Sequence, residues 1–116
     1  MNTLEKACKD YDSNIKTNGI CVINTNTGEI EFSESFTDET NQILNNSLSS
    51  GKLKDFNSQF NSIFYKRGFP SIIRIKHDHY SEFIKFLDVN HIMYFIQENT
   101  SINYPKIKIQ LTKLAA

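Results

Sequence analysis

The sequence predicts a single α+β domain, in which helices pack on a mostly antiparallel sheet of about five strands. Three observations support this class. The 116 residues are the length of one typical domain. They are 39% hydrophobic and include nine Phe and five Tyr, enough large apolar side chains for one core. Segments with helical apolar spacing alternate with short β-branched segments, and the expected element order is α-β-β-α-α-β-α-β-β.

The first half of the chain is predicted to form a helix, a β-hairpin and a second helix. Apolar residues recur at helical spacing over residues 3–16, and Asn18-Gly19 ends this helix because glycine tolerates a left-handed C-terminal position. Two strands, residues 19–24 and 29–36, flank a turn rich in Asn and Thr. A helix then begins at Thr37, whose hydroxyl can cap it, and ends at Ser49-Ser50-Gly51. One face of the second strand is expected to carry Ile30, Phe32 and Phe36.

The second half is predicted from the same two periodicities. The expected elements are a helix with apolar residues from Leu53 to Phe64, a strand over 71–77, a helix over 78–89, a strand over 91–98 and a strand over 106–111. The residues expected to form one buried cluster are Ile30, Phe32, Phe56, Phe60, Ile73, Ile75, Phe83, Leu87, Ile107 and Ile109. The domain is expected to occupy residues 1–112. Residues 113–116, Lys-Leu-Ala-Ala, are similar to the start of an expression-vector tail.

The predicted element order resembles two known kinds of domain. In the first half it is similar to that of sensor and scaffold domains of the PAS and roadblock types. In the last half, strand–helix–strand–strand is similar to a split βαβ unit. These resemblances concern architecture, and because one fold hosts many functions, the function has to be argued from the residues.

Charge is distributed unevenly, although the whole chain carries no net charge. Residues 1–50 contain three basic and eight acidic side chains, and residues 51–116 contain ten basic and five acidic ones. Five of the acids lie between Glu29 and Glu39. A neutral chain is not typical of a general nucleic-acid-binding protein, which carries a basic excess. A run of acids is most often ordinary solvated surface, but it also fits an electrostatic docking patch for a basic protein.

We therefore hypothesise a small non-catalytic binding protein that neutralises a protein partner, most specifically a bacterial toxin-immunity protein that blocks a basic toxin such as a nuclease. The residues expected at the interface are Glu29, Glu31, Asp38 and Glu39. A phage-encoded inhibitor of a host protein predicts the same surface.

A nucleic-acid-binding α+β module is the other alternative. It would use the basic later half of the chain. In that case Arg74 and Lys76 would share one strand face, and Lys106 and Lys108 would share another. Tyr94 or Phe95 would be exposed between them.

Signals of catalysis or of a bound cofactor are weak. No Gly-x-Ser-x-Gly motif occurs, and the four glycines are not clustered. His77 and His79 lie two residues apart and His91 begins the next predicted strand, so these histidines are the candidates for a metal or acid–base site. Cys8 and Cys21 are expected to be free, buried thiols rather than a disulfide. We expect no enzymatic activity, no cofactor and no bound metal.

Targeting signals are also absent from the sequence. The N-terminal segment lacks a basic region followed by an apolar one, and no run of 18 apolar residues occurs. We therefore expect a cytoplasmic protein with no membrane segment.

Overall fold

The computed structural model describes residues 3–51, 72–88 and 90–114. Its elements in chain order are α1 (Thr3–Ile15), β1 (Ile20–Asn24), β2 (Ile30–Glu34), α2 (Asp38–Ser49), β3 (Ile73–Lys76), β4 (Tyr80–Asp88), β5 (His91–Glu98), the 3₁₀-helix η1 (Asn99–Ser101) and α4 (Tyr104–Leu114). The helix predicted between Leu53 and Phe64 lies outside the described residues.

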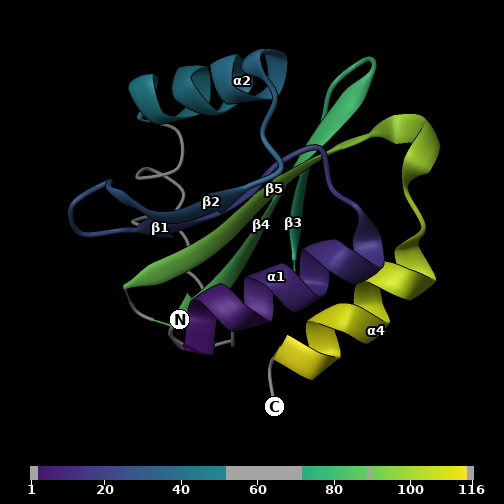
Figure 1. Cartoon of the computed structure of the whole chain (residues 1–116). Coiled ribbons are helices and arrows are strands. Elements are labelled where there is room, and N and C mark those ends of the chain that lie inside the picture. The colour runs from purple at the N-terminus through teal and green to yellow at the C-terminus, as the bar shows by residue number, and fades with distance from the viewer. Residues whose placement is uncertain (1–2, 52–71, 89, 115–116) are drawn as a thin grey trace, which may run out of the picture.

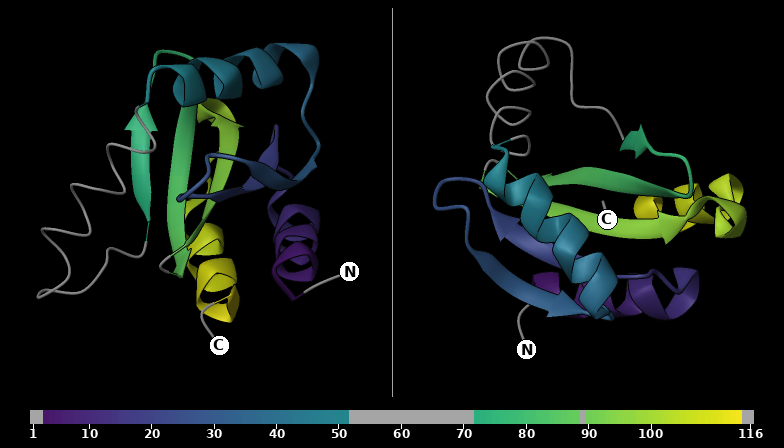
Figure 2. Two further views of the ribbon diagram at one scale, coloured as in Figure 1. Left: turned by 90° about the vertical axis from the view of Figure 1, so that its left-hand side faces the viewer. Right: turned by 90° about the horizontal axis from the view of Figure 1, so that it is seen from above.

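The five strands form one antiparallel sheet in the order β2-β1-β5-β4-β3. Helix α2 crosses one face of the sheet, and α1 and α4 cover the other face (Figures 1 and 2). The predicted α+β class with a five-stranded antiparallel sheet is confirmed. Within the described part of the chain, no helix is long and apolar enough to cross a membrane.

The sheet separates two apolar cores, because successive side chains of a strand point to opposite faces. The core under α1 and α4 contains Cys8, Tyr11, Ile15, Ile20, Val22, Phe83, Met93, Phe95 and Ile107. The core under α2 contains Cys21, Ile23, Leu44, Ile84, Ile92, Tyr94 and Ile96. The prediction of one cluster is therefore wrong.

The predicted core residues differ widely in burial. Phe83 and Ile107 are buried, whereas Ile30 is 39% and Ile109 is 58% exposed. Four others are half-buried: Phe32, Ile73, Ile75 and Leu87. Phe56 and Phe60 lie outside the described residues.

The helix predicted over residues 78–89 is a strand. Tyr80, Phe83, Ile84 and Leu87 have helical spacing, but they belong to β4, which pairs with β3 on one side and β5 on the other. Phe83 points toward α1 and α4, and Ile84 points toward α2. A strand that is buried on both faces carries apolar residues in succession, so the alternation that normally identifies a strand is missing.

The strand predicted over residues 106–111 is part of helix α4. Two hydrogen bonds from backbone N–H groups to Asn103 explain this. The side-chain Oδ1 of Asn103 accepts from Lys106 N (3.1 Å), and the Asn103 carbonyl accepts from Ile107 N (3.0 Å). Pro105 suits the first turn of a helix, where its missing N–H would have had no intrahelical partner. The Asn-Tyr-Pro sequence was thus a helix start signal, and this signal outweighed the Ile/Lys alternation that favoured a strand.

The alternation predicted for β2 is interrupted by a bulge. Val22 pairs with Phe32 and the next residue of β1, Ile23, pairs with Ile30, so one residue of β2 is additional. Phe32 therefore packs on the core under α1, whereas Phe36 packs on the core under α2. The expectation that Ile30, Phe32 and Phe36 share one face is wrong. The bulge separates Ile30 from Phe32, and Phe36 comes after the end of β2 at Glu34 and after Ser35, whose φ is 66°.

The turn after α1 also differs from the prediction. The residue in the left-handed region is Lys16 (φ 60°) and not Gly19. Asp12 Oδ1 stabilises this turn by accepting from Thr17 N (3.0 Å). Gly19 has φ 148°, and a Cβ at this position would lie 2.5 Å from the Phe36 ring, so glycine is needed there for close packing as well as for its φ.

Candidate functional site

The four acids predicted to form one patch lie at two separate places. Glu29 and Glu31 belong to the β1–β2 hairpin, which lies beside Leu48 and Gly51 at the C-terminal end of α2. Asp38 and Glu39 occupy the first turn of the same helix. An α-helix rises 1.5 Å per residue, so the 12 residues of α2 put roughly 18 Å between the two ends of the helix. The structure brings each pair together but does not join the two pairs.

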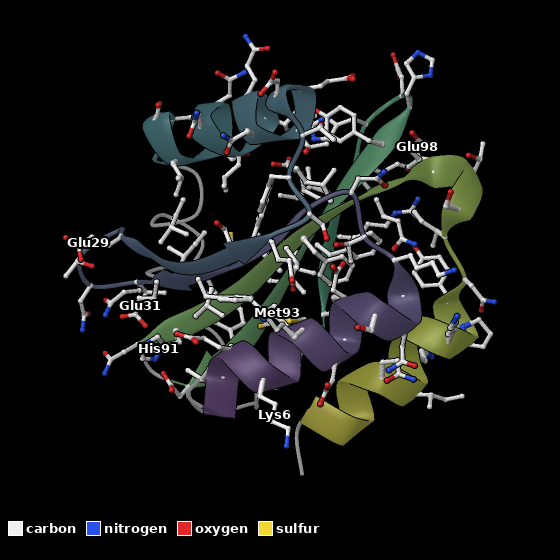
Figure 3. All side chains as sticks on the ribbon, viewed as in Figure 1. Lys6, Glu29, Glu31, His91, Met93 and Glu98 are labelled. Carbon is white, nitrogen blue, oxygen red and sulfur yellow. The ribbon has the colours of Figure 1, made fainter. Side chains whose placement is uncertain are left out.

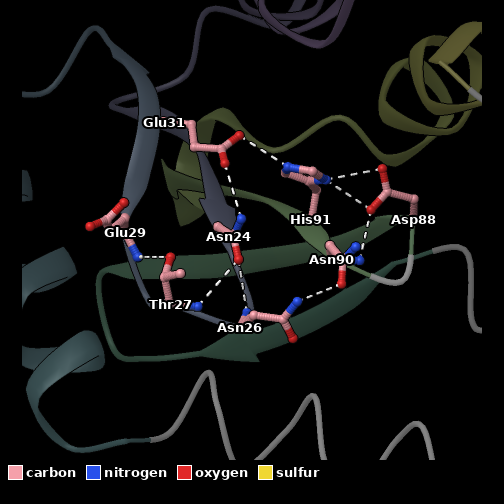
Figure 4. A network of polar contacts seen from close by, with 8 residues as sticks. All are labelled: Asn24, Asn26, Thr27, Glu29, Glu31, Asp88, Asn90 and His91. Carbon is pink, nitrogen blue, oxygen red and sulfur yellow. Dashed lines mark hydrogen bonds and ion pairs between the residues drawn. The ribbon is translucent and has the colours of Figure 1, made fainter.

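At the hairpin, Glu31 is already engaged with other side chains. Glu31 Oε2 lies 3.0 Å from His91 Nε2, and Glu31 Oε1 accepts from Asn24 Nδ2 at 3.1 Å. The other ring nitrogen of His91 lies 2.9 Å from Asp88 Oδ1 (Figure 4). Glu29 is exposed and joins the network through its backbone: its N–H donates to Thr27 Oγ1, and its carbonyl accepts from Asn24 N. Glu31 thus has less charge to offer a partner than the sequence suggested.

The two carboxylates change the titration of the histidine between them. The hydrogen bond to Asp88 raises the pKa of His91 above its ordinary value, and the negative charges of Asp88 and Glu31 act in the same direction, against the opposing effect of burial. Burial would raise the pKa of Asp88, but hydrogen bonds from Asn90 N–H and from His91 outweigh it and keep that pKa below its ordinary value. Both pKa shifts favour an ion pair between His91 of β5 and Asp88 at the end of β4.

Raising the pH from about 6 to about 8 is expected to lower the free energy of unfolding. The pKa of His91 is raised in the folded state, so its contribution is fully present below the ordinary histidine pKa of about 6.5 and is lost as the pH rises through the raised value. Urea unfolding at both pH values measures this loss, which the His91→Asn variant should not show.

His79→Asn is the matched control for this experiment, because His79 is exposed. This variant should keep the wild-type loss of stability between the two pH values. Equal losses in the wild type and in the His91→Asn variant would show that the ion pairs of His91 do not contribute to stability.

A second polar cluster is buried between α2 and the sheet. Glu82 on β4 is 1% exposed. Its Oε1 accepts hydrogen bonds from Ser47 Oγ of α2 and from Tyr94 Oη of β5 (2.5 Å for Tyr94), and its Oε2 lies 2.8 Å from His77 Nε2. Burial raises the pKa of the Tyr94 hydroxyl, and the bond to Glu82 raises it further, so Tyr94 remains a donor. This carboxylate joins α2 to three other segments of the fold.

Sequence reasoning missed Glu82 as a buried residue. Its neighbours in the sequence were assigned to a helix, where an acid between apolar positions is expected on the solvated face. The signal that could have identified it is its position next to Phe83 and Ile84 in a strand covered on both faces.

The three histidines do not gather into one site. His77 contacts Glu82 and stacks on the Tyr80 ring at 4.5 Å, whereas His79 is exposed. His91 begins β5 and lies at the far end of that strand from Glu98 (Figure 3). Within residues 3–51, 72–88 and 90–114, no group of three or more His, Cys, Asp or Glu side chains could hold a metal ion. His77, His79 and His91, which the sequence analysis considered together, therefore do not form a common site.

The predicted nucleic-acid-binding sheet is not formed. Lys106 and Lys108 lie on helix α4 and not on a strand. Tyr94 and Phe95, the aromatics that would have to stack on bases, are fully buried. Arg74 is engaged by its neighbours: it donates to Ser81 Oγ at 2.9 Å, and its guanidinium lies over the Tyr104 ring. No exposed aromatic platform lies between basic strands in the described part of the sheet.

Cys8 and Cys21 are free and buried, as predicted. They belong to different cores on opposite faces of the sheet, which explains why they do not pair. Burial raises the pKa of the Cys8 thiol to about 12, with Asp12 adding to the shift. Burial also raises the pKa of Cys21. Both thiols are therefore protonated at neutral pH and behave as apolar core residues.

The two outer strands of the sheet differ in character. β2 carries acids and is largely exposed, and Ile30 is its exposed apolar residue. β3 carries Ile73 and Ile75, which are half-buried and pack against the core under α2. Among the described strands, β3 has a neighbour on one side only, β4. Charges discourage a further strand from adding to an edge, whereas half-covered isoleucines favour it.

No protein-family model matches the sequence, and a search of curated proteins finds no match. Among solved structures, MglB of Myxococcus xanthus superposes with a TM-score of 0.74 at 11% identity, covering 99% of this chain and 90% of that one. A Roadblock/LC7 domain from Streptomyces avermitilis gives a TM-score of 0.70 at 8% identity, covering 98% and 92%. The fold is that of a Roadblock/LC7 domain. A structure of MglB in a tetrameric arrangement gives 0.65 at 6% identity, covering 95% and 80%.

These structures overturn the functional hypothesis drawn from the sequence. The chain resembles Roadblock/LC7-type domains over nearly its whole length, and the hypothesis of a toxin-immunity protein or antitoxin is wrong. The argument failed because it used the absence of motifs and a run of acids, and both are compatible with many binding proteins. The resemblance by element order covered the first half of the chain only, and it did not distinguish roadblock domains from PAS domains.

Proposed function

We propose that this chain is a non-catalytic protein-interaction domain of the Roadblock/LC7 type, which assembles with a second copy of itself through the side formed by β3. The observation that carries the proposal is the outer edge of β3, where half-buried isoleucines lie beside a strand edge without a described neighbour. A second β3 added to that edge would extend the sheet and cover these side chains.

The contrast between the two sheet edges supports the choice of β3. At β2, Glu29, Glu31 and Glu34 would bring like charges together if two copies met edge to edge. At β3, Ile73 and Ile75 point toward the α2 side, while Arg74 is held on the other face by its bond to Ser81. A second copy that approaches this edge therefore meets Ile73 and Ile75 on one face. On the other face it meets Arg74, which is already hydrogen-bonded to Ser81.

The comparisons support self-assembly in general terms. One of the similar structures is MglB in a tetrameric arrangement, so a domain of this fold is seen with several copies together. The polar clusters described above point the same way, because Glu31 and Glu82 direct their carboxylates at neighbours within the chain and not at a shared open site. These features fit a domain whose function is performed by its surface.

The Ile75→Lys variant tests the proposed assembly. Sedimentation equilibrium of the wild type is expected to give the mass of two chains or a multiple of it, and Ile75→Lys is expected to give the mass of one. A lysine at this edge places a charge where the partner's apolar side chains would pack, which opposes association.

Ile30→Lys provides the matched control, since it makes the same change on the other outer strand at an exposed isoleucine. It should leave the mass unchanged. Circular dichroism shows whether both variants keep the fold. A wild type that sediments as a single chain, or an Ile30→Lys variant that dissociates while Ile75→Lys does not, would contradict the proposed interface.

A further inference from the structure

A cavity of about 380 Å³ lies at the N-terminal end of α2. Its aliphatic lining residues are the half-buried Ile43 of α2 and the buried Ile96 of β5. Tyr80 contributes an aromatic wall. The volume is within the range of small binding pockets, about 300–1,000 Å³. The remaining lining is polar: Asn18, Thr37, Glu39, Thr40, His79, Glu98 and Thr100.

The two acids of the cavity differ from the acids at the hairpin. Glu39 comes from the first turn of α2 and Glu98 from the last position of β5, so they approach the cavity from different elements. Both side chains are exposed, and neither forms an ion pair within the described part of the chain. Glu31, by contrast, pairs with His91 at the other end of the sheet (Figure 3). The carboxylates of Glu39 and Glu98 are therefore available to a ligand of this cavity.

We propose that the cavity binds a basic side chain, arginine or lysine, of a partner protein. This inference rests on the proposed function as an interaction domain and specifies the chemistry of a partner. The aliphatic part of such a side chain would lie on Ile43 and Ile96, and its charged end would meet Glu39 and Glu98 at the rim. Long basic side chains combine an apolar stem with a cationic head, which matches a cavity lined by both aliphatic and acidic residues.

The positive end of the α2 dipole opposes this binding and has to be weighed. It corresponds to about half an elementary charge and falls off within the first turn. The capping box of Thr37 and Thr40 satisfies N–H groups at that end, since Thr37 Oγ1 accepts from Thr40 N. Two unpaired carboxylates outweigh half a charge, so the cavity favours a cation over an anion.

The test is an NMR titration of the ¹⁵N-labelled full chain with the peptide acetyl-Gly-Arg-Gly-amide. Shifts of backbone amides are expected to concentrate at Glu39, Thr40, His79 and Glu98 and to saturate with a dissociation constant of about 1 mM, the scale of a single side chain in a pocket. The same peptide with citrulline, which is neutral but similar in shape, should produce no such shifts. The E39Q/E98Q variant should bind the arginine peptide about tenfold more weakly.

The D10N/E29Q variant is the matched control, because it removes the same net charge from exposed acids outside the cavity and should bind as the wild type does. The proposal would be overturned if the shifts spread over all exposed acids, or if the citrulline peptide produced equal shifts. It would also be overturned if E39Q/E98Q bound as the wild type does, or if an acetyl-Gly-Asp-Gly-amide peptide bound at the same amides. Binding of the peptide at the cavity is measured independently of the number of chains in the assembly. If the chain sediments as one copy but still binds the arginine peptide at this cavity, the proposed β3 interface is wrong and the proposed cavity site stands.

Discussion

Replacing Phe83 with Ala is expected to lower the free energy of unfolding by about 3–5 kcal/mol. The Phe83 side chain is fully buried at the centre of the sheet, and its ring stacks on Phe95 with centroids 4.7 Å apart. Removing it leaves a cavity under α1 and α4 that neighbouring strands cannot fill by small movements, because β4 is paired on both sides. Urea unfolding followed by circular dichroism measures the change.

Ile109→Ala is the control for this substitution. The sequence pattern assigned Phe83 and Ile109 to the same core, but Ile109 is 58% exposed on α4. Its replacement by Ala, a stronger helix former, is expected to change the free energy of unfolding by less than about 0.5 kcal/mol. Comparable losses in the two variants would show that α4 is placed incorrectly on the sheet.

Glu82→Ala is expected to destabilise the fold by about 2–6 kcal/mol, because it leaves the two buried hydroxyls of Ser47 and Tyr94 without an acceptor at about 1–3 kcal/mol each. The half-buried His77 loses the same acceptor. Buried donors without an acceptor lose the hydrogen bonds that water would supply in the unfolded chain. The expected loss can be read from the midpoint and slope of urea unfolding.

A double-mutant cycle separates the hydrogen bond from general packing. Tyr94→Phe alone should cost about 1–2 kcal/mol, because Glu82 loses one donor. In the Glu82→Ala background the same change should cost little, since the Tyr94 hydroxyl no longer has its acceptor, and the coupling energy should be about 1–2 kcal/mol. Additive effects of the two substitutions would mean that the network contributes nothing beyond its separate side chains.

The predictable parts of the fold were those with a local cause. The boundaries of α1, β1 and α2 follow from apolar spacing and from the Thr37 cap, which depend on neighbouring residues only. β4 and α4 were misassigned because the secondary structure of these segments depends on their tertiary environment. β4 is covered on both faces, so it lacks the alternation of a half-exposed strand. α4 has a single buried position, Ile107, among its described side chains, so it lacks a helical apolar stripe.

The candidate site was less predictable than the fold. Glu39 and Glu98 are 59 positions apart in the sequence, and only the return of β5 to the N-terminal end of α2 brings them to one cavity. Glu31 was correctly recognised as acidic surface, but its pairing with His91 depends on the register of β1 with β2 and β5. Charge can be counted along a chain, whereas its neutralisation requires long-range contacts.

By itself the sequence determined the class of the fold, the paired strands of the hairpin, and the presence of two buried thiols that do not form a disulfide. These depend on composition, on local periodicity and on turn residues, each of which acts over a few neighbours. The tertiary structure alone decided the division into two cores, the burial of Glu82 under α2, and the separation of the acids into a paired and an unpaired group. The physical reason is that burial and ion pairing are fixed by which strands become neighbours, and strand order is set by contacts between residues far apart in the chain.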